Sequence, residues 1–190
     1  MDPILIDFPQ EFETERLKIR MPLPGDGAYV YDAVIESIEE LKVWLPFANG
    51  EQTKEKSEIS VRQSYSNFIL RSDLRMHIFH KENGNFIGST GLHRMDWQVR
   101  KFEIGYWIRT SEAQKGYMIE AIRGLTQFAF DQLAANRVEI RCDEQNERSK
   151  KIPEKLGYML EGTLRNEDLN SHGKLRNTLV YSIIEKSNLK

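Results

Sequence analysis

The segment from residue 101 to residue 133 constrains this chain more than any other. A strand pattern over Lys101 to Arg109 is followed by the turn Gln114-Lys115-Gly116, and an amphipathic helix then runs from about Tyr117 to Leu133. The first N–H groups of a helix have no partner within it, and its amino end carries partial positive charge. With Lys115 beside them, these amides predict a phosphate-binding site. A strand that leads into such a turn can hold a pyrophosphate with its tail laid along the strand.

The length and composition predict a globular protein with one domain, residues 1–190. Hydrophobic residues make up 39% of the 190 residues, which is enough for a substantial core. No linker or internal repeat divides the chain. There are 27 basic and 29 acidic side chains, for a formal net charge of -2. Because no strong basic field results, we expect no direct binding to nucleic acid.

The cysteine and histidine content argues against a metal site or a disulfide. Cys142 is the one cysteine, so a disulfide within the chain is excluded. His77 and His80 are three residues apart on a strand pattern and therefore face opposite sides. We expect no metal ion. The sequence shows no basic leader with an apolar run and no apolar stretch of 18 residues, so we expect no membrane span and a cytoplasmic protein.

Apolar periodicity and turn residues predict the order of elements. We expect one strand, two helices, three antiparallel strands, a helix, a strand, a helix and two strands, at residues 14–20, 29–41, 53–69, 75–81, 86–91, 102–108, 117–133, 138–142, 148–156, 158–165 and 175–184. Asp26 is expected to cap the helix of residues 29–41. A strand-helix-strand unit inside a mostly antiparallel sheet predicts an α+β (mixed α/β) fold.

Several short motifs occur in a familiar order over residues 14–184. They are Thr14-Glu15-Arg16-Leu17, Glu103-Ile104-Gly105-Tyr106-Trp107-Ile108, Lys115-Gly116-Tyr117, Asn146 with Ser149, and Glu154-Lys155-Leu156-Gly157-Tyr158. In this order the chain resembles the GCN5-related N-acetyltransferase (GNAT) superfamily, and within it the ribosomal-protein N-terminal acetyltransferases of the Rim type. The resemblance implies a mostly antiparallel central sheet with helices on both faces.

The resemblance also implies acetyl-CoA as co-substrate and a set of residues that hold it. By this likeness the coenzyme contacts are Trp107, Ile108, Arg109, Gln114, Lys115, Gly116, Tyr117, Met118 and Asn146. The family's phosphate turn has Gln or Arg, two residues, Gly, one residue, then Gly or Ala. Here those positions hold Ala113, Gly116 and Met118, so only Gly116 matches fully. Pro153 stands where many relatives have the Tyr that protonates the leaving thiolate, and proline should bend its helix or delay its start.

Acetyl transfer to an amine needs a deprotonated amine, a donor for the developing oxyanion, and a donor for the leaving thiolate. We expect a backbone N–H at Tyr106 to Ile108 for the oxyanion. Ser149 is the candidate for the thiolate, with a helix cap as its alternative role. Glu103 and Asp168 are equal candidates for the base, and ordinary surface charge is the alternative for both. His93 ranks third, since a lone histidine at a strand end is more often a surface residue.

The expected reaction is acetyl transfer to a primary amine, by resemblance the α-amine of a protein N-terminus such as that of a ribosomal protein. Two alternatives are a small-amine acetyltransferase and a non-catalytic acyl-CoA-binding module. Trp44, Phe47 and Trp97 are candidates for an acceptor groove or for the core. Cys142 is expected to be structural, with a covalent acetyl-enzyme as the alternative. We expect a monomer or a homodimer.

Overall fold

The computed structural model describes residues 2–190 and contains one eight-stranded sheet in the order β1-β2-β3-β4-β5-β6-β8-β7. The strands are β1 (Glu11–Glu13), β2 (Leu17–Arg20), β3 (Leu74–His80), β4 (Phe86–Asp96), β5 (Lys101–Ile108), β6 (Arg137–Asp143), β7 (Met159–Leu169) and β8 (Leu175–Ile183). The helices are α1 (Gly27–Glu36), α2 (Ile38–Trp44), α3 (Lys54–Ile69), α4 (Tyr117–Leu133) and α5 (Glu147–Leu156).

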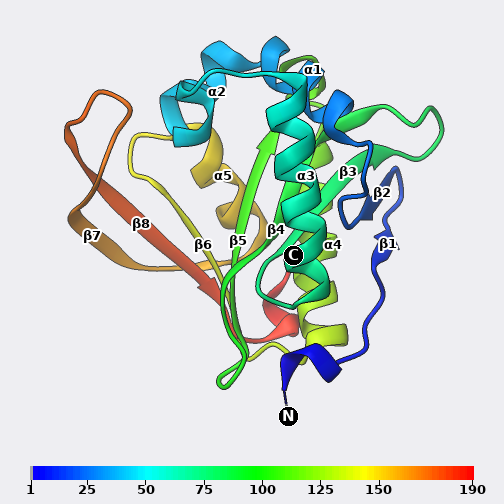
Figure 1. Cartoon of the computed structure of the whole chain (residues 1–190). Helices are drawn as coiled ribbons and strands as arrows, with labels where there is room; N and C mark the ends of the chain where they lie inside the picture. The colour runs from blue at the N-terminus through cyan, green and yellow to red at the C-terminus, as the bar shows by residue number, and fades with distance from the viewer. Residues whose placement is uncertain (1) are drawn as a thin grey trace.

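Neighbouring strands are antiparallel except at the centre of the sheet, where β5 and β6 are parallel. The helix α4 connects these two strands and packs on the sheet between them, as a parallel crossover requires. Figure 1 shows α3 in front of the sheet and α4 and α5 behind it, with the β7–β8 hairpin extending away on the left. The predicted mixed fold with a mostly antiparallel sheet and helices on both faces is confirmed.

Alternate residues of β3 show how the two faces are covered. Met76 and Ile78 belong to the main core, which also contains the apolar stripe of α4. Phe79 packs with Ala33 of α1 in a smaller cluster on the other face. On that second face His77 is fully buried against Asp26, whereas His80 lies beside Tyr117 at the start of α4. The two histidines therefore point to opposite sides, as their spacing predicted.

The first helical segment differs from its prediction. Residues 29–41 were expected to form one helix, but the structure has two, because Ser37 leaves the helical conformation with φ of -107° and ψ of 10°. Asp26 does not cap α1 with its side chain. Instead it accepts hydrogen bonds from Arg20, from the Leu23 N–H and from His77. Burial would raise the pKa of Asp26, but these partners hold it well below its ordinary range.

Two strands are longer than their patterns predicted, and both extensions carry candidate residues. β4 continues beyond Gly91 to Asp96 and so includes His93. β7 continues beyond Arg165 to Leu169 and includes Asp168. Strand β1 was missed because a segment of three residues is too short to show an alternating pattern.

Candidate active site

The parallel strands β5 and β6 separate at the centre of the sheet. Their pairing runs from Lys101↔Arg137 to Ile104↔Ile140, and β5 then continues alone to Ile108. The Arg109 N–H donates to Ile87 O of β4, and Thr90 donates to Gly105 O, so odd-numbered residues here turn their backbone groups toward β4. Tyr106 and Ile108 therefore direct theirs toward the other edge. That edge has no paired strand among the described residues, so its N–H groups are available to a bound molecule.

The turn between β5 and α4 has the backbone geometry of an anion site. A single 3₁₀ turn, η3 (Thr110–Glu112), leads into Gln114 and Gly116, which are both left-handed with φ of 63° and 84°. Helix α4 begins at Tyr117, and no side chain caps its first amides. The free amides and the positive end of the helix thus meet at this turn, as the sequence predicted. The Lys115 ammonium pairs with Glu112 at 2.8 Å, which keeps it beside the turn.

A hydrogen-bonded anchor holds the turn from the side of β2, and sequence reasoning missed its role. Glu120 of α4 accepts from Thr14 Oγ1 at 2.6 Å, from the Arg16 N–H at 2.8 Å and from Arg16 Nε at 2.7 Å. Arg16 also donates to Lys115 O and lies 4.5 Å over the Tyr117 ring. Burial would raise the pKa of Glu120, but the bonds from Thr14 and Arg16 outweigh it and lower that pKa. The motif Thr14-Glu15-Arg16-Leu17 is visible in the sequence, but only the fold shows that Thr14 and Arg16 bind Glu120 beside the turn.

A second anchor comes from the break between α1 and α2. Ser37 Oγ accepts from the Thr110 N–H at 2.9 Å, and Glu36 accepts from the Ser111 N–H and from Arg109 Nε. The Arg109 guanidinium, a predicted coenzyme contact, is thus paired with Glu36 at 2.6 Å. The break in the helix that the sequence did not predict therefore has a purpose, because it places Ser37 against the segment that leads to the turn.

Other predicted coenzyme contacts differ in what they can offer. Met118 is buried in the main core, so it presents its backbone N–H rather than its side chain. Trp107 packs with the clusters beneath α1 and α2, and its ring lies 6.3 Å from the Phe47 ring.

The candidates for an acceptor groove fall into two groups. Trp97 is a core residue that packs on Phe102. Trp44 and Phe47 are exposed on α2 and η2 (Pro46–Asn49), so they stay candidates for an acceptor surface.

Helix α5 brings Ser149 to β5. Asn146 is the residue that caps α5, accepting from the Ser149 N–H at 3.0 Å, so Ser149 is not itself the cap. The Ser149 hydroxyl lies 3.0 Å from the Tyr106 hydroxyl. Both side chains therefore lie where β5 has separated from β6, beside the open edge. The proximity of Ser149 to this edge follows from the parallel crossover and the position of α5.

Pro153 does not delay α5, which begins at Glu147 and runs through the proline to Leu156. Because Pro153 has no N–H, the Ser149 carbonyl lacks its normal helical donor. The Tyr106 hydroxyl replaces that donor and bonds to Ser149 O at 3.1 Å. Burial raises the pKa of Tyr106, so its hydroxyl keeps its proton. The helix therefore tolerates proline through a tertiary hydrogen bond that no local rule predicts.

The two candidate carboxylates are both paired with arginines. Glu103 lies 3.3 Å from Arg94 and 3.4 Å from Arg141. Asp168 pairs with Arg176 at 2.8 Å. The Leu169 N–H and Arg176 lower the pKa of Asp168, and Arg94 contributes as well. The Arg94 charge thus acts on both carboxylates.

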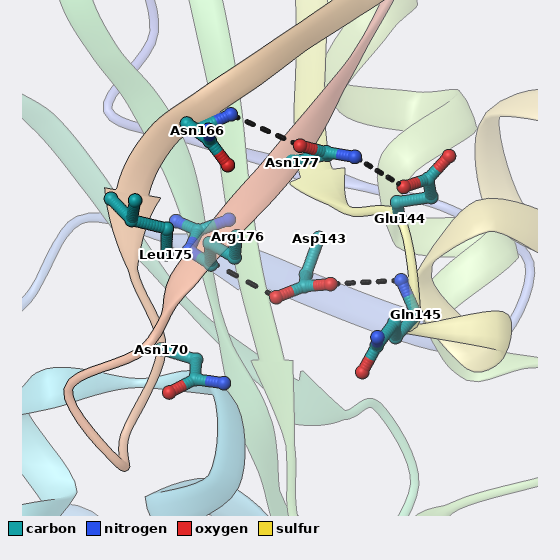
Figure 2. Close-up of a pocket in the computed structure, with 8 residues that line it drawn as sticks. All are labelled: Asp143, Glu144, Gln145, Asn166, Asn170, Leu175, Arg176 and Asn177. Atoms are coloured by element: carbon teal, nitrogen blue, oxygen red, sulfur yellow. Dashed lines mark hydrogen bonds and ion pairs between the residues drawn. The ribbon is translucent and has the colours of Figure 1, made fainter.

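A polar cavity of about 190 Å³ lies between the end of β6 and the β7–β8 hairpin. Figure 2 shows its lining, in which Asn166, Asn177 and Glu144 form one hydrogen-bonded row and Asp143 lies between Arg176 and Gln145. Arg176 is shared with Asp168, so that candidate lies at the margin of the cavity. This hollow suits a polar group, and sequence reasoning did not find it.

Cys142 is buried, and burial raises its pKa to about 11. A thiol with that pKa is protonated near neutral pH and is a poor nucleophile, which favours the structural role. Across residues 2–190, no three His, Cys, Asp or Glu side chains come together as a metal ion would require. In the same residues no helix is both long enough and apolar enough to cross a lipid bilayer.

Comparison with known proteins decides the family. The model of the acetyltransferase (GNAT) domain matches residues 16–159. The chain belongs to the GNAT acetyltransferase family. Acetyl-CoA is accordingly the co-substrate of this enzyme, and the non-catalytic alternative is not supported.

Relatives of this GNAT acetyltransferase extend along nearly the whole chain. The putative ribosomal N-acetyltransferase YdaF of Bacillus subtilis is 29% identical over 90% of this chain and 93% of its own length. The ribosomal-protein-serine acetyltransferase of Escherichia coli is 27% identical over 65% of this chain and 70% of its own. A solved probable acetyltransferase has a TM-score of 0.85 at 27% identity, covering 93% of this chain and 98% of that one. The ribosomal L7/L12 α-N-protein acetyltransferase RimL, solved with coenzyme A, also has a TM-score of 0.85, at 17% identity over 92% and 97% of the two chains.

Proposed function

We propose that this GNAT acetyltransferase transfers acetyl from acetyl-CoA to the α-amine of a protein N-terminus, with a ribosomal protein as the expected class of acceptor. The observation that carries this proposal is the full-length likeness to a relative named as a ribosomal N-acetyltransferase. The exposed hairpin beside the site supports it, because a polypeptide acceptor needs an open surface rather than a closed pocket. We propose that residues 1–190 form the single domain that carries out this reaction.

The residues of the turn fit the diphosphate of the coenzyme. Gln114 and Gly116 hold left-handed conformations that leave the amides before α4 without internal partners, as an anion cradle requires. Lys115 adds a positive charge, and Ile108, whose backbone groups face the open edge of β5, offers its carbonyl to the pantetheine arm. Asn146 stays a proposed contact for that arm through its amide nitrogen, because its oxygen caps α5. When bound, acetyl-CoA supplies an acetyl group activated as a thioester.

The chain's own groups can perform the remaining steps. We assign oxyanion stabilisation to the N–H groups of Tyr106 and Ile108, which face the open edge of β5. Ser149 is assigned to the leaving sulfur as a hydrogen-bond donor, and the Tyr106 hydroxyl positions this residue by donating to Ser149 O at 3.1 Å. Tyr106 thereby takes the position of a supporting donor in a chain that has Pro153 where many relatives carry a catalytic tyrosine.

Glu103 and Asp168 lie on the acceptor side, and their charges attract the ammonium of an incoming amine. Both are partly neutralised by arginines at 2.8 to 3.4 Å. This pairing orients the carboxylates, and the bonds from the Leu169 N–H and Arg176 lower the pKa of Asp168, which weakens Asp168 as a proton acceptor. They stay the two carboxylate candidates for the base.

The direct test is a release assay for free coenzyme thiol with acetyl-CoA and a panel of acceptors. The panel contains N-terminal peptides of ribosomal proteins, the same peptides with a blocked α-amine, polyamines and amino acids. We expect turnover with the free peptides and none with the blocked ones, with mass spectrometry locating acetyl on the α-amine. Faster turnover on small amines would replace the protein acceptor with a small one.

A variant isolates the thiolate step. Ser149→Ala is expected to lower kcat by about tenfold, as the loss of one hydrogen bond of about 1.4 kcal/mol would, while the affinity for acetyl-CoA changes less than twofold. The matched control is Ser171→Ala in the exposed turn between β7 and β8. Unchanged kcat in Ser149→Ala would remove Ser149 from the reaction.

A further inference from the structure

His93 of β4 forms a hydrogen-bonded pair with Asp73, the residue before β3. Its Nδ1 lies 2.6 Å from Asp73 Oδ2, while Asp73 Oδ1 accepts from the Arg75 N–H at 3.1 Å. An ionised carboxylate only accepts hydrogen bonds, so Nδ1 carries the ring proton and Nε2 of a neutral ring presents a lone pair. The structure records no hydrogen bond to Nε2 within residues 2–190. The side chain is 29% exposed, so this nitrogen can be reached from solvent.

Two glycines form the floor on which the imidazole ring lies. A Cβ added to Gly91 would lie 3.0 Å from His93 Cε1, and one added to Gly105 would lie 2.9 Å from Cδ2 and 3.2 Å from Nε2. Gly91 and Gly105 are paired across β4 and β5. Any larger residue at either position would lift or turn the ring. These glycines therefore have a specific physical purpose, which is to seat His93 flat against the sheet.

The ring lies next to the site of acyl transfer. Gly105 immediately precedes Tyr106, whose N–H faces the open edge of β5. His93 is also the cross-strand partner of Glu103, so both side chains project from the same face of the sheet. An amine at the open edge on this face therefore lies on the same side of the sheet as the ring and its free nitrogen.

Charged groups from several elements surround the ring. They are Asp73 before β3, Arg75 of β3, Arg94 of β4 and Glu103 of β5. The Glu103 carboxylate lies between Arg94 and Arg141, and Asp168 is bound by Arg176, so both of these carboxylates are occupied by ion pairs. His93 Nε2 has no such partner within residues 2–190, so it is free to accept a proton.

We propose that His93 is the general base of this acetyltransferase and that Asp73 is the residue that positions it. The inference rests on the proposed acetyl transfer to an amine. The acceptor ammonium gives one proton to Nε2, and the freed lone pair forms the C–N bond with the acetyl carbon as the C–S bond breaks. The second proton leaves the nitrogen and ends on the coenzyme sulfur. The imidazolium returns its proton to water, so one proton is released per acetyl transferred.

The test measures kcat/KM against pH from 5.5 to 9.5 for the full chain and for His93→Gln, Asp73→Asn, Glu103→Gln and Asp168→Asn. Calorimetry with acetyl-CoA accompanies each variant. We expect His93→Gln to lower kcat/KM about 100-fold at pH 7, which is the low end of general base effects. The fall of kcat/KM toward low pH, the acidic limb of the profile, should also disappear in this variant. Asp73→Asn should shift that limb and should lower kcat/KM less than His93→Gln does. Affinity for acetyl-CoA should stay within twofold in every variant.

Chemical rescue separates proton transfer from structure. His93→Ala leaves a space above Gly91 and Gly105. Added imidazole should raise the rate of this variant at least tenfold. The matched control His172→Gln, in the exposed β7–β8 turn, should match the parent chain. If His93→Gln keeps the rate and the acidic limb, or if Glu103→Gln or Asp168→Asn removes that limb instead, His93 is not the base. If the parent chain binds acetyl-CoA but acetylates no amine, the proposed function itself fails.

Discussion

The turn before α4 and the β7–β8 hairpin are held in contrasting ways. Side chains from two distant segments, at Thr14 to Arg16 and at Glu36 to Ser37, fasten the turn and the residues that lead into it. Strand β7, in contrast, pairs with β8 alone, and all of its 11 residues are exposed. The proposed coenzyme side is therefore a backbone turn fastened by hydrogen bonds, while the proposed acceptor side consists of paired charges on an open surface.

This difference matches what each side must recognise. A diphosphate is the same in every reaction cycle, so backbone amides and a helix end can be built for it once. An acceptor is specific to each enzyme and is read by side chains, which change without altering the fold. Substitutions on the two sides should consequently affect different measured quantities.

The largest expected effect is on the coenzyme side, from Gly116→Val. Gly116 has φ of 84°, and a Cβ there would lie 3.3 Å from Arg16 Nη2. A branched residue in this conformation costs about 2 kcal/mol, so the turn should shift and the affinity for acetyl-CoA should fall roughly 30-fold. Isothermal titration calorimetry measures this affinity. Gly162→Val in β7, where a Cβ meets nothing within 4 Å, is the control and should bind normally. Equal losses in both would end the distinction between the two sides.

The second prediction concerns the link between β5 and α5. Tyr106→Phe removes the donor to Ser149 O and should lower the free energy of unfolding by about 1.5 kcal/mol, because it leaves a carbonyl unpaired. Urea denaturation measures this free energy of unfolding. Pro153→Ala supplies a helical N–H to the same carbonyl. In that background Tyr106→Phe should cost clearly less, and an undiminished cost would show that the tyrosine does not replace the missing donor.

The third prediction tests the anchor from the helix break. Ser37→Ala leaves the Thr110 N–H without its partner at 2.9 Å. A loss of about 1 kcal/mol at the turn corresponds to roughly fivefold weaker binding of acetyl-CoA. KM for the peptide acceptor should not change by more than twofold. A rise in that KM with normal coenzyme affinity would assign Ser37 to the acceptor side instead.

The smallest expected effect is on the acceptor side and depends on pH. Hydrogen bonds from Arg137 and Ser182 lower the pKa of Glu161 in β7 to about 2, from an ordinary 4.5. Because the folded pKa is the lower one, the stabilising contribution is complete above pH 4.5 and is lost as the pH falls toward 2. Glu161 is partly exposed, so the contribution is under about 1 kcal/mol. Thermal unfolding of Glu161→Gln should show a smaller loss of stability over this range than the parent chain. An identical loss would mean that the ion pair contributes nothing.

Local patterns predicted the start of α4 well and the contacts between distant segments poorly. The bounds of α4 match the prediction, because its apolar stripe is long and the preceding glycine marks its start. The pairing of His93 with Asp73 was not predicted, since 20 residues separate them and only the pairing of β3 with β4 brings them together. The cavity beside Arg176 was missed for the same reason.

By itself the sequence determined the periodic elements, the turn before α4 and the family, because each depends on short stretches of residues whose spacing follows helix or strand geometry. Only the tertiary structure decided which side chains meet. It separated β5 from β6 beyond Ile104, placed the Tyr106 hydroxyl on the Ser149 carbonyl, and seated His93 on two glycines. The physical reason is that these contacts join residues far apart in the chain, and their geometry depends on sheet register and helix packing rather than on local preference.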